Sequence, residues 1–408
     1  MMKRIYLDHA AATYVEPKVK AAMEPYFIRY FGNASALYEE GRVAKKAIQE
    51  SRKKIASILN ARPEEIIFTG SGTEGDNLAV LGVCRAYRLP AGQAGQAGKN
   101  QGKHIITTKI EHPAVLEAVK TLEKEGFKST VLNVDKNGIV DLKQLKSTLT
   151  KDTILVSVMY ANNEIGAIQP IAEIAKIIRD FKKTYQLPTT NYQLPVFHTD
   201  AVQAANYLDL DVLKLGVDLL TLNGSKIYGP KGIGALYIKK GIKLEPLVYG
   251  GGQEFNIRSG TENIAGIVGL AKALELVQRD KIKESNRLLK LRDKLMKGIV
   301  AKIPNVEING SMVERLPNNA NVSIFGVEGE SVVLYLDAKG ISCSTGSACH
   351  SSSLEPSHVI MAIQRSSEYA HGSIRFSLGR KNTVADINYV LKVLPGIVKI
   401  LRRMSALI

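Results

Sequence analysis

Strand-like and helix-like segments alternate along the chain from about residue 42, and this alternation limits the possible folds more than any other feature. Residues 65–72, EIIFTGSG, have the short apolar run of a buried strand, and residues 73–87 have the character of a following helix. Such alternation is typical of an α/β fold in which a mostly parallel central sheet is flanked by helices. Further strands are predicted at 104–109, 153–160, 195–200, 218–223 and 232–239, and further helices at 42–60 and 171–185.

The pattern changes after about residue 264. Long amphipathic helices are predicted there, followed by strand-like pieces at 321–327 and 373–378 and a basic amphipathic helix at about 383–403. A chain of 408 residues also exceeds the usual size of one domain. We therefore expect a large α/β domain and a smaller α+β C-terminal domain.

The charge balance is strongly basic, with 55 Lys and Arg against 39 Asp and Glu and a formal net charge of +16. The excess is spread along segments such as 281–302, without interleaved aromatic residues or a nucleic-acid motif. This distribution favours a solvated basic face and predicts no direct nucleic-acid binding. We expect the charge to attract an anionic cofactor or an acidic protein partner.

Three cysteines, Cys84, Cys343 and Cys349, are an odd number and too few for a disulfide framework in a chain of this length. The N-terminal sequence reaches Asp8 after three uncharged residues, which is too short for a signal peptide. No segment offers the roughly 18 uncharged apolar residues that a membrane helix requires. These features predict a cytoplasmic protein without membrane spans.

Two stretches interrupt the alternation. Residues 90–102, PAGQAGQAGKNQG, are of low complexity and predict a mobile surface loop. Residues 185–195 contain YQLP twice, which indicates a local duplication within a connection. Neither stretch carries residues that suggest chemistry.

The stretch 222–234, LNGSKIYGPKGIG, combines glycines with two lysines. A P-loop would need Gly-Lys followed by Ser or Thr, but Pro230 follows Gly229 and Gly232 follows Lys231, so this motif is excluded. Lys226 instead lies just past a predicted strand, where open α/β sheets place their ligand sites. From this segment alone, an exposed turn lysine and a reactive amine both remain open.

A glycine turn, Gly70 to Gly72, joins another predicted strand to a helix that begins near Thr73. Free backbone amides and the positive end of the helix dipole favour anions at such a turn. The hydroxyls of Ser71 and Thr73 add hydrogen-bond donors. The segment therefore predicts an anion site.

Two further strand ends carry polar groups. Asp200, with Gln203 three residues later, suits either a helix N-cap or the anion that keeps a pyridine nitrogen protonated. His112 suits either a structural role or a ring that stacks on a flat cofactor and shuttles protons. A lysine, an aspartate, an anion site and a histidine at strand ends together favour pyridoxal phosphate.

Cys349 lies within SCSTGSACHSSS, residues 342–353, which has almost nothing apolar to bury a thiol. An accessible loop favours a reactive cysteine, and sulfur chemistry is therefore indicated. Cys343 and Cys349 are too few for a convincing zinc site.

With these motifs in order, the sequence resembles the cysteine desulfurases, pyridoxal-phosphate enzymes of the class V aminotransferase family that supply sulfur for iron–sulfur clusters and thiolated tRNA. The resemblance runs nearly end to end, and the cysteine loop resembles that of the housekeeping iron–sulfur type. It implies a fold-type-I transferase with a large cofactor-binding domain, 15–263, and a small domain, 1–14 and 264–408, that carries a mobile cysteine loop at about 342–358. The matching motifs are YLDHAAAT (6–13), SGTEGDNLA (71–79), EHPAV (111–115), NNEIGAIQP (162–170), HTDAVQA (198–204), KIYGPKGIGALY (226–237), RSGTEN (258–263), STGSAC (344–349) and IRFSLGR (374–380).

The resemblance also implies three catalytic residues. Lys226 would attach the cofactor and then remove the Cα proton of L-cysteine, and His112 would stack on the ring. Cys349 would take the substrate sulfur as a persulfide and leave L-alanine as the product. An acidic acceptor or scaffold protein would then receive the sulfur.

Binding roles follow from the same resemblance. Arg375 would clamp the substrate carboxylate, with Asn163 beside it. The chain is expected to form a homodimer in which Thr261 reaches the cofactor phosphate of the partner subunit. No resident metal is implied, and a transient iron–sulfur cluster on Cys349 is left open. The expected cofactor contacts are Gly72, Thr73, Asn163, Asp200, Gln203, Asn223, Ser225 and Thr261.

The sequence departs from the family pattern in four places. Ser225 stands where a histidine is usual, which predicts weaker cofactor retention because a hydroxyl brings no partial positive charge. Phe255 stands where a basic residue is common, and His350 follows the cysteine where a small hydroxyl residue is usual. Residues 90–102 resemble an insertion.

Two alternatives remain at this stage. One is a related fold-type-I enzyme with another substrate, such as a selenocysteine lyase. The other is a non-catalytic scaffold for sulfur transfer. The sequence does not choose between cluster assembly and tRNA thiolation, nor does it identify the acceptor protein.

Overall fold

The structure is a computed structural model that describes residues 4–87, 103–184, 194–346 and 356–404. Residues 90–102, nearly all of 185–195, Cys349 and His350 lie outside the described residues. The predictions made for these positions are therefore not tested by the structure.

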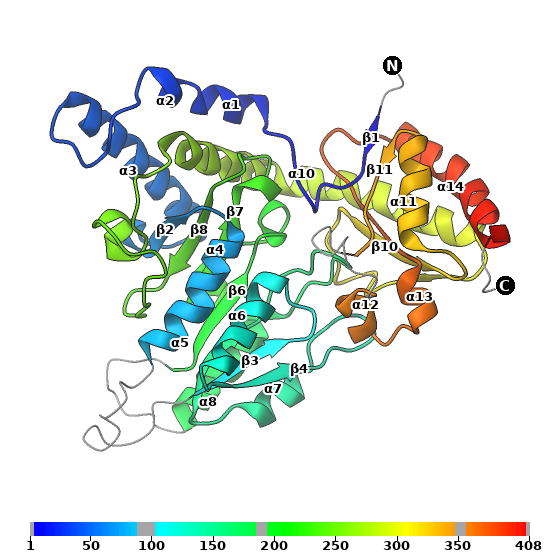
Figure 1. The fold of residues 1–408 in the computed structure, drawn as a ribbon, viewed down its shortest axis with the longest axis horizontal. Helices are drawn as coiled ribbons and strands as arrows, with labels where there is room; N and C mark the ends of the chain where they lie inside the picture. The colour runs from blue at the N-terminus through cyan, green and yellow to red at the C-terminus, as the bar shows by residue number, and fades with distance from the viewer. Residues whose placement is uncertain (1–3, 88–102, 185–193, 347–355, 405–408) are drawn as a thin grey trace.

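A seven-stranded sheet forms the centre of the larger part of the molecule (Figure 1). The strand order is β2-β8-β7-β6-β5-β3-β4, and only β8 runs antiparallel to its neighbours. The predicted mostly parallel sheet is confirmed. Its strands are β2 (Ile66–Thr69), β3 (His104–Thr108), β4 (Lys128–Leu132), β5 (Thr153–Ser157), β6 (Val196–Asp200), β7 (Leu219–Asn223) and β8 (Gly234–Ile238).

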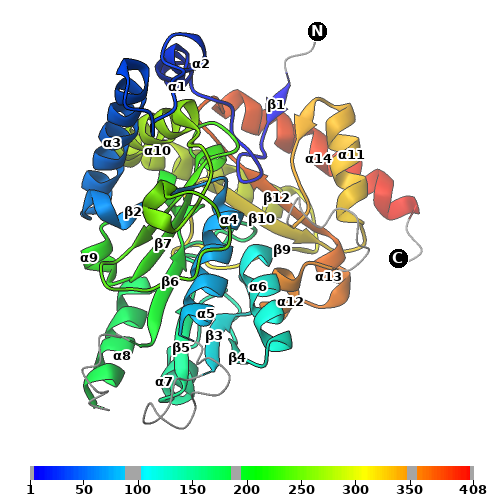
Figure 2. The ribbon, with the colours of Figure 1, turned by 60° about the vertical axis from the view of Figure 1, so that its left-hand side comes forward.

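Helices cover both faces of this sheet (Figure 2). Successive side chains of a strand enter different cores: Ile105 packs with one helical layer and Ile106 with the other. Burial on both faces explains why the strands have nearly continuous apolar runs. One layer contains α4 (Gly72–Asn77), a π-helical stretch (Leu78–Gly82), α5 (Val83–Ala86) and α6 (Pro113–Lys124); the other contains α3 (Glu39–Leu59), α7 (Leu142–Thr148), α8 (Ile171–Thr184) and α9 (Val212–Leu215).

The C-terminal part is built on a smaller antiparallel sheet of order β12-β10-β9. A separate parallel pair joins β1 near the N-terminus to β11, so the start of the chain packs with its C-terminal part. This arrangement fits the predicted α+β character. The elements are β1 (Ile5–Tyr6), β9 (Val306–Ile308), β10 (Asn319–Ile324), α11 (Gly329–Ala338), β11 (Ile341–Ser342), α12 (His358–Ala362), α13 (Ser367–His371), β12 (Ser373–Ser377) and α14 (Val384–Met404).

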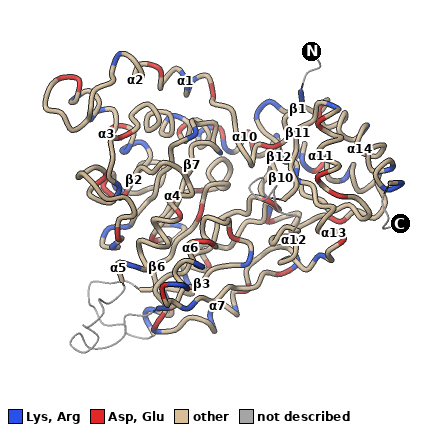
Figure 3. Tube along the Cα trace, viewed as in Figure 1, with Lys and Arg blue, Asp and Glu red and all other residues tan. Residues whose placement is uncertain are grey.

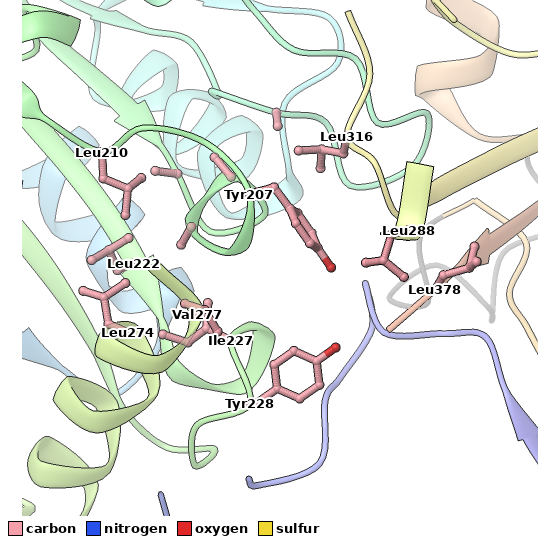
Figure 4. Packing of buried hydrophobic residues seen from close by; sticks show 14 of the residues in the cluster. Tyr207, Leu210, Leu222, Ile227, Tyr228, Leu274, Val277, Leu288, Leu316 and Leu378 are labelled. Atoms are coloured by element: carbon pink, nitrogen blue, oxygen red, sulfur yellow. The ribbon is translucent and has the colours of Figure 1, made fainter. Parts of the chain in front are cut away.

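A single helix, α10 (Ile264–Lys302), runs from the central sheet to the smaller one (Figure 1). Several helices were expected in this region, but the segment contains no proline before Lys302, and the helix continues through Gly266, Gly269 and Gly298. The side chains around α10 form a continuous apolar cluster between the two parts of the molecule (Figure 4). The short helices α1 (Pro17–Met23) and α2 (Pro25–Ile28) lie near α10 and α3.

Basic residues are distributed over most elements rather than gathered in one groove (Figure 3). On α10, Lys290, Lys294 and Lys297 are exposed, as the solvated-face prediction requires. Arg292 is an exception, because it is 2% exposed and donates to the carbonyl oxygen of Leu316 at 3.2 Å.

Among the described residues, no helix combines the length and apolar character that crossing a bilayer requires.

Candidate active site

A cavity lies at the ends of the central strands and reaches β12 of the smaller sheet. It encloses about 740 Å³ including its open mouth. Residues from the predicted set and several others line it together. These are Ala10, Ala11, Gly72, Thr73, Asp76, His112, Met159, Asn163, Asp200, Val202, Gln203, Asn223, Lys226 and Arg375.

Lys226 enters this cavity from a short 3₁₀ turn, Gly224–Lys226, that directly follows β7. Its ammonium group donates to the carbonyl oxygen of Ala11. Gly224 is required at this turn, since an added Cβ would lie 2.6 Å from the carbonyl oxygen of Pro230. Lys231 is exposed and does not line the cavity, which separates the two lysines as the sequence suggested.

Asp200 ends β6 and is 6% exposed. Its Oδ1 accepts a hydrogen bond from the Val202 amide at 2.8 Å. Burial raises the pKa of this carboxyl to about 6, although the Val202 amide and the positive charge of Lys226 act in the opposite direction. The N-cap alternative is not borne out in its usual form, because the helical turn that follows begins only at Ala204.

The glycine turn leads into α4 at Gly72, one residue before the predicted start. Ser71 is the N-cap and accepts from the Glu74 amide at 3.1 Å, so its oxygen is already engaged. Gly72 packs tightly, since an added Cβ would lie 2.9 Å from Val202 Cγ2 and 3.2 Å from Asn223 Cβ. A larger residue would therefore not fit at Gly72. Thr73, the next residue, lines the cavity at the start of α4.

His112 caps α6, where its Nδ1 accepts from the Ala114 amide at 3.1 Å. Its ring also lines the cavity. The two interpretations of this histidine are thus compatible, because one ring nitrogen serves the helix while the ring faces the cavity.

Arg375 is 1% exposed on β12 and brings the smaller sheet to the cavity. One guanidinium nitrogen donates to Asp8 Oδ1 at 2.8 Å, and another donates to the carbonyl oxygen of Asn163 at 3.0 Å. The Nε atom is buried without a hydrogen-bond partner. The fork is therefore fixed in place by two parts of the chain far apart in sequence.

Of four further predicted cofactor contacts, two line the cavity and two do not. Gln203 lines the cavity but donates to the carbonyl oxygen of Ala10 at 3.0 Å, and Asn223 lines it while accepting from the Ser225 amide at 3.2 Å. Ser225 and Thr261 do not line the cavity. The Ser225 hydroxyl lies 3.3 Å from Asn223 Oδ1, and Thr261 is exposed.

Sequence reasoning missed two acidic residues of the site. Asp8 fixes Arg375, and Asp76 lines the cavity from α4. Both lie inside motifs that carried the resemblance, YLDHAAAT and SGTEGDNLA. Their position in these motifs, near the end of a strand or helix, could have identified them as site residues. Among the described residues, no group of three or more His, Cys, Asp and Glu side chains is arranged to hold a metal ion.

A mostly parallel sheet with a strand-end lysine, a buried aspartate and a histidine at one cavity is consistent with one family of proteins, the class V aminotransferases. The family model for Aminotransferase class-V matches residues 5–390. The chain belongs to this family, and within it to the cysteine desulfurases, because relatives of that name match it at about half identity over its whole length.

The chain is 50% identical over 409 aligned positions to "Cysteine desulfurase IscS" of Clostridium botulinum, covering 100% of this chain and 97% of the relative. It is 51% identical to "Cysteine desulfurase IscS" of Methanosarcina thermophila, covering 99% and 94%. A solved structure described as a "NifS-like protein" matches with a TM-score of 0.86 and 33% identity, covering 98% of this chain and 100% of the other. Another, "SspA in complex with cysteine", matches with a TM-score of 0.76 and 33% identity over 92% of this chain and 99% of the other.

Proposed function

We propose that this protein is a pyridoxal-phosphate-dependent cysteine desulfurase that converts L-cysteine to L-alanine and passes the sulfur to Cys349. The sulfur then serves iron–sulfur cluster assembly and tRNA thiolation. The observation that carries the proposal is the convergence of Lys226, Asp200, His112 and Arg375 on one cavity in a chain of this family.

The residues of the cavity fit pyridoxal phosphate. Asp200 offers a buried carboxylate to a protonated ring nitrogen, and Lys226 offers an amine to the aldehyde. The close packing around Gly72 lets backbone approach a phosphate near Thr73. When bound, pyridoxal phosphate supplies an electron sink that makes the Cα proton of an amino acid removable.

Residues of this chain then orient and deprotonate the substrate. Arg375 binds the carboxylate of L-cysteine through its fixed fork, with Asn163 beside it. With the cofactor bound, Lys226 would hold and move the Cα proton, and His112 would lie against a face of the ring. Because the Asp8 contact already fixes the guanidinium, the substrate meets a preorganised cation.

Sulfur transfer requires a second nucleophile. The thiolate of Cys349 attacks the substrate sulfur, so that an S–S bond forms while the Cβ–S bond breaks. The electron pair of the broken bond stays with the carbon fragment, which takes up protons and leaves as L-alanine. The persulfide on Cys349 is then available to an acceptor.

The test is incubation of the purified protein with L-cysteine, with alanine and sulfide measured together. Lys226→Ala should abolish both products, whereas Lys231→Ala, a matched lysine outside the cavity, should leave both unchanged. Cys349→Ala should keep the cofactor absorbance and lose sulfide release. Normal turnover in Cys349→Ala would refute the assignment, preferential use of selenocysteine would favour a lyase, and cofactor binding without alanine would favour a scaffold.

We further propose a homodimer whose contact face includes Thr261. Support comes from a run of large exposed apolar side chains near α2, namely Phe27, Ile28, Phe31, Leu37 and Tyr38, with exposures between 60% and 90%. A pocket joins the adjoining residues Ala34 and Ser35 to Phe255 and Glu262, so this face is continuous with the Thr261 segment. A second copy would cover the apolar side chains.

Analytical ultracentrifugation of Phe31→Glu/Leu37→Glu tests this face. The double variant should sediment as a monomer, whereas Val313→Glu, which alters a side chain 81% exposed elsewhere, should remain dimeric. A dimer in the double variant would contradict the proposed interface.

Three further assignments belong to the same proposal. The division into residues 15–263 and residues 1–14 with 264–408 is supported by the pairing of β1 with β11 and by the start of α10 at Ile264. An acidic acceptor or scaffold protein is supported by the net charge of +16. A cytoplasmic location is supported by the need to keep the Cys349 thiol reduced.

A further inference from the structure

An acidic residue lies beside the proposed phosphate site, although the proposed chemistry does not use it. Gly72 and Thr73 begin α4, which continues without a break through the π-helical stretch and α5 to Ala86. The first amides of a helix have no acceptor within it, so they can meet an anion. Glu74, the next residue, adds a negative charge at the same end of the helix. This charge stabilises the helix but repels a phosphate that binds there.

The Glu74 carboxylate is held against the glycine turn. Its Oε2 accepts from the Gly70 amide at 2.8 Å, and a Cβ added to Gly70 would lie only 2.7 Å from that oxygen. The Glu74 amide donates to the hydroxyl of Ser71, the N-cap of α4, at 3.1 Å. The negative charge of Glu74 therefore has a fixed position beside the proposed phosphate site.

Arg258 lies directly against this charge. Its Nε donates to Glu74 Oε1 at 2.8 Å, and its Nη2 donates to Glu74 Oε2 at 3.3 Å. This two-point contact is the geometry in which a guanidinium and a carboxylate pair best. The two side chains are 28% and 24% exposed, so water screens their charges only in part.

The segment that carries Arg258 is fixed by its own contacts. Glu254 is 6% exposed and accepts from Arg52 at 2.6 Å and 2.8 Å. Glu254 also has a left-handed backbone, with a φ of 45°, which persists only where surrounding contacts impose it. Next to Arg258, the Ser259 hydroxyl donates to the carbonyl oxygen of Gly251 at 2.7 Å. Arg258 therefore reaches α4 from a preorganised segment, and little further ordering is needed to form the ion pair.

We propose that Arg258 is a positioning residue that neutralises Glu74, so that the start of α4 keeps its attraction for the phosphate of the cofactor. This inference rests on the proposed function, because the phosphate near Thr73 is the group that is attracted. With Arg258 in place, the Glu74 carboxylate can cap the glycine turn without repelling the phosphate. Without Arg258, the same carboxylate faces the phosphate as an uncompensated like charge.

The test compares pyridoxal phosphate with pyridoxal, which lacks the phosphate, in titrations of the cofactor-free protein followed by absorbance. Arg258→Met should raise the dissociation constant of pyridoxal phosphate about tenfold, as expected for like charges several ångströms apart at a partly screened site. The dissociation constant of pyridoxal should change less than about twofold, because no phosphate is repelled. An equal loss for both ligands would show that Arg258 only supports the local fold, and the proposal would fail.

Removing the Glu74 charge as well should restore binding. The double variant Arg258→Met/Glu74→Gln has no carboxylate left to neutralise, and the glutamine side-chain oxygen can still accept from the Gly70 amide. Its affinity for pyridoxal phosphate should return to within about threefold of the unaltered protein. A double variant that binds as weakly as Arg258→Met would overturn the proposal, because the loss would then not come from the charge of Glu74.

Arg85→Met is the matched control. Arg85 pairs with Glu125 at similar exposures, 27% and 25%, and neither residue lines the cavity. This variant should bind both ligands as the unaltered protein does, and a tenfold loss would show that breaking any such pair has the same effect, against the proposal. If the unaltered protein binds no pyridoxal phosphate, the proposed function fails. Binding that Arg258→Met does not weaken refutes only the role of Arg258.

Discussion

Replacing Asp200 by asparagine should stabilise the cofactor-free protein while impairing the holoenzyme. Asparagine has nearly the same shape, and its Oδ1 can still accept from the Val202 amide at 2.8 Å. What it removes is a buried negative charge, since Asp200 is only 6% exposed. The substitution therefore separates the energetic cost of this charge from its packing.

The magnitude follows from the pKa of Asp200, which burial raises from 3.8 to about 6. The folded protein then binds the carboxyl proton more tightly than the unfolded chain, so the contribution to stability is full below pH 3.8 and is lost as pH rises through about 6. A difference of about two units corresponds to roughly 3 kcal/mol at 1.36 kcal/mol per unit. Asp200→Asn should thus be more stable by roughly 3 kcal/mol at pH 7.5, and this gain should vanish near pH 4.

Urea denaturation of both cofactor-free proteins at several pH values between 4 and 7.5 measures this difference directly. Asp218→Asn is a matched control, since Asp218 is buried but paired with Lys239 at 3.0 Å, and losing that partner should lower stability. A destabilised Asp200→Asn at pH 7.5, or a difference independent of pH, would refute the reasoning. Added pyridoxal phosphate should reverse the order, because loss of a buried charge partner costs about 2–5 kcal/mol of cofactor binding.

Three other substitutions give separate expectations. Arg375→Lys should raise the KM for L-cysteine by about 30-fold or more with a smaller change in kcat, because a point charge replaces the bidentate fork; steady-state kinetics decide this, and an unchanged KM would contradict the clamp. Ser225→His should slow loss of pyridoxal phosphate about tenfold on dialysis, followed by absorbance, if a ring at this position reaches the phosphate; equal retention would place the phosphate elsewhere. Glu254→Gln should lower the free energy of unfolding by about 3–5 kcal/mol in urea, because Arg52, which Glu254 binds at 2.6 Å and 2.8 Å, would remain buried without its anion; a loss below about 1 kcal/mol would refute that estimate.

The central sheet was predictable because its strands are buried on both faces. The apolar runs at 153–160 and 218–223 predict β5 and β7 without any information on tertiary contacts. β4 was missed because its residues, KSTVL, form a partly exposed edge strand whose polar side chains match a loop equally well. The antiparallel direction of β8 was also hidden, because strand direction depends on the connection and not on the residues of the strand.

The site was predictable where one residue carries the chemistry at a strand end, as Lys226 and Asp200 do. It was not predictable where a role depends on a distant partner. Asp8 has no visible function until β12 brings Arg375 beside it. Ser225 was expected at the cofactor, but its hydroxyl faces Asn223 and it does not line the cavity.

The pairing of β1 with β11 has a consequence for protein synthesis. Residues up to about 240 contain all seven strands of the central sheet, so that sheet can assemble while the rest of the chain is still on the ribosome. The ion pair between Asp8 and Arg375 spans 367 residues and cannot form until β12 has been made. A nascent chain can therefore present Lys226 and Asp200 well before it can grip the carboxylate of an amino acid. The chain can bind substrate only after Arg375 has left the ribosome and β1 has paired with β11, which is late in synthesis.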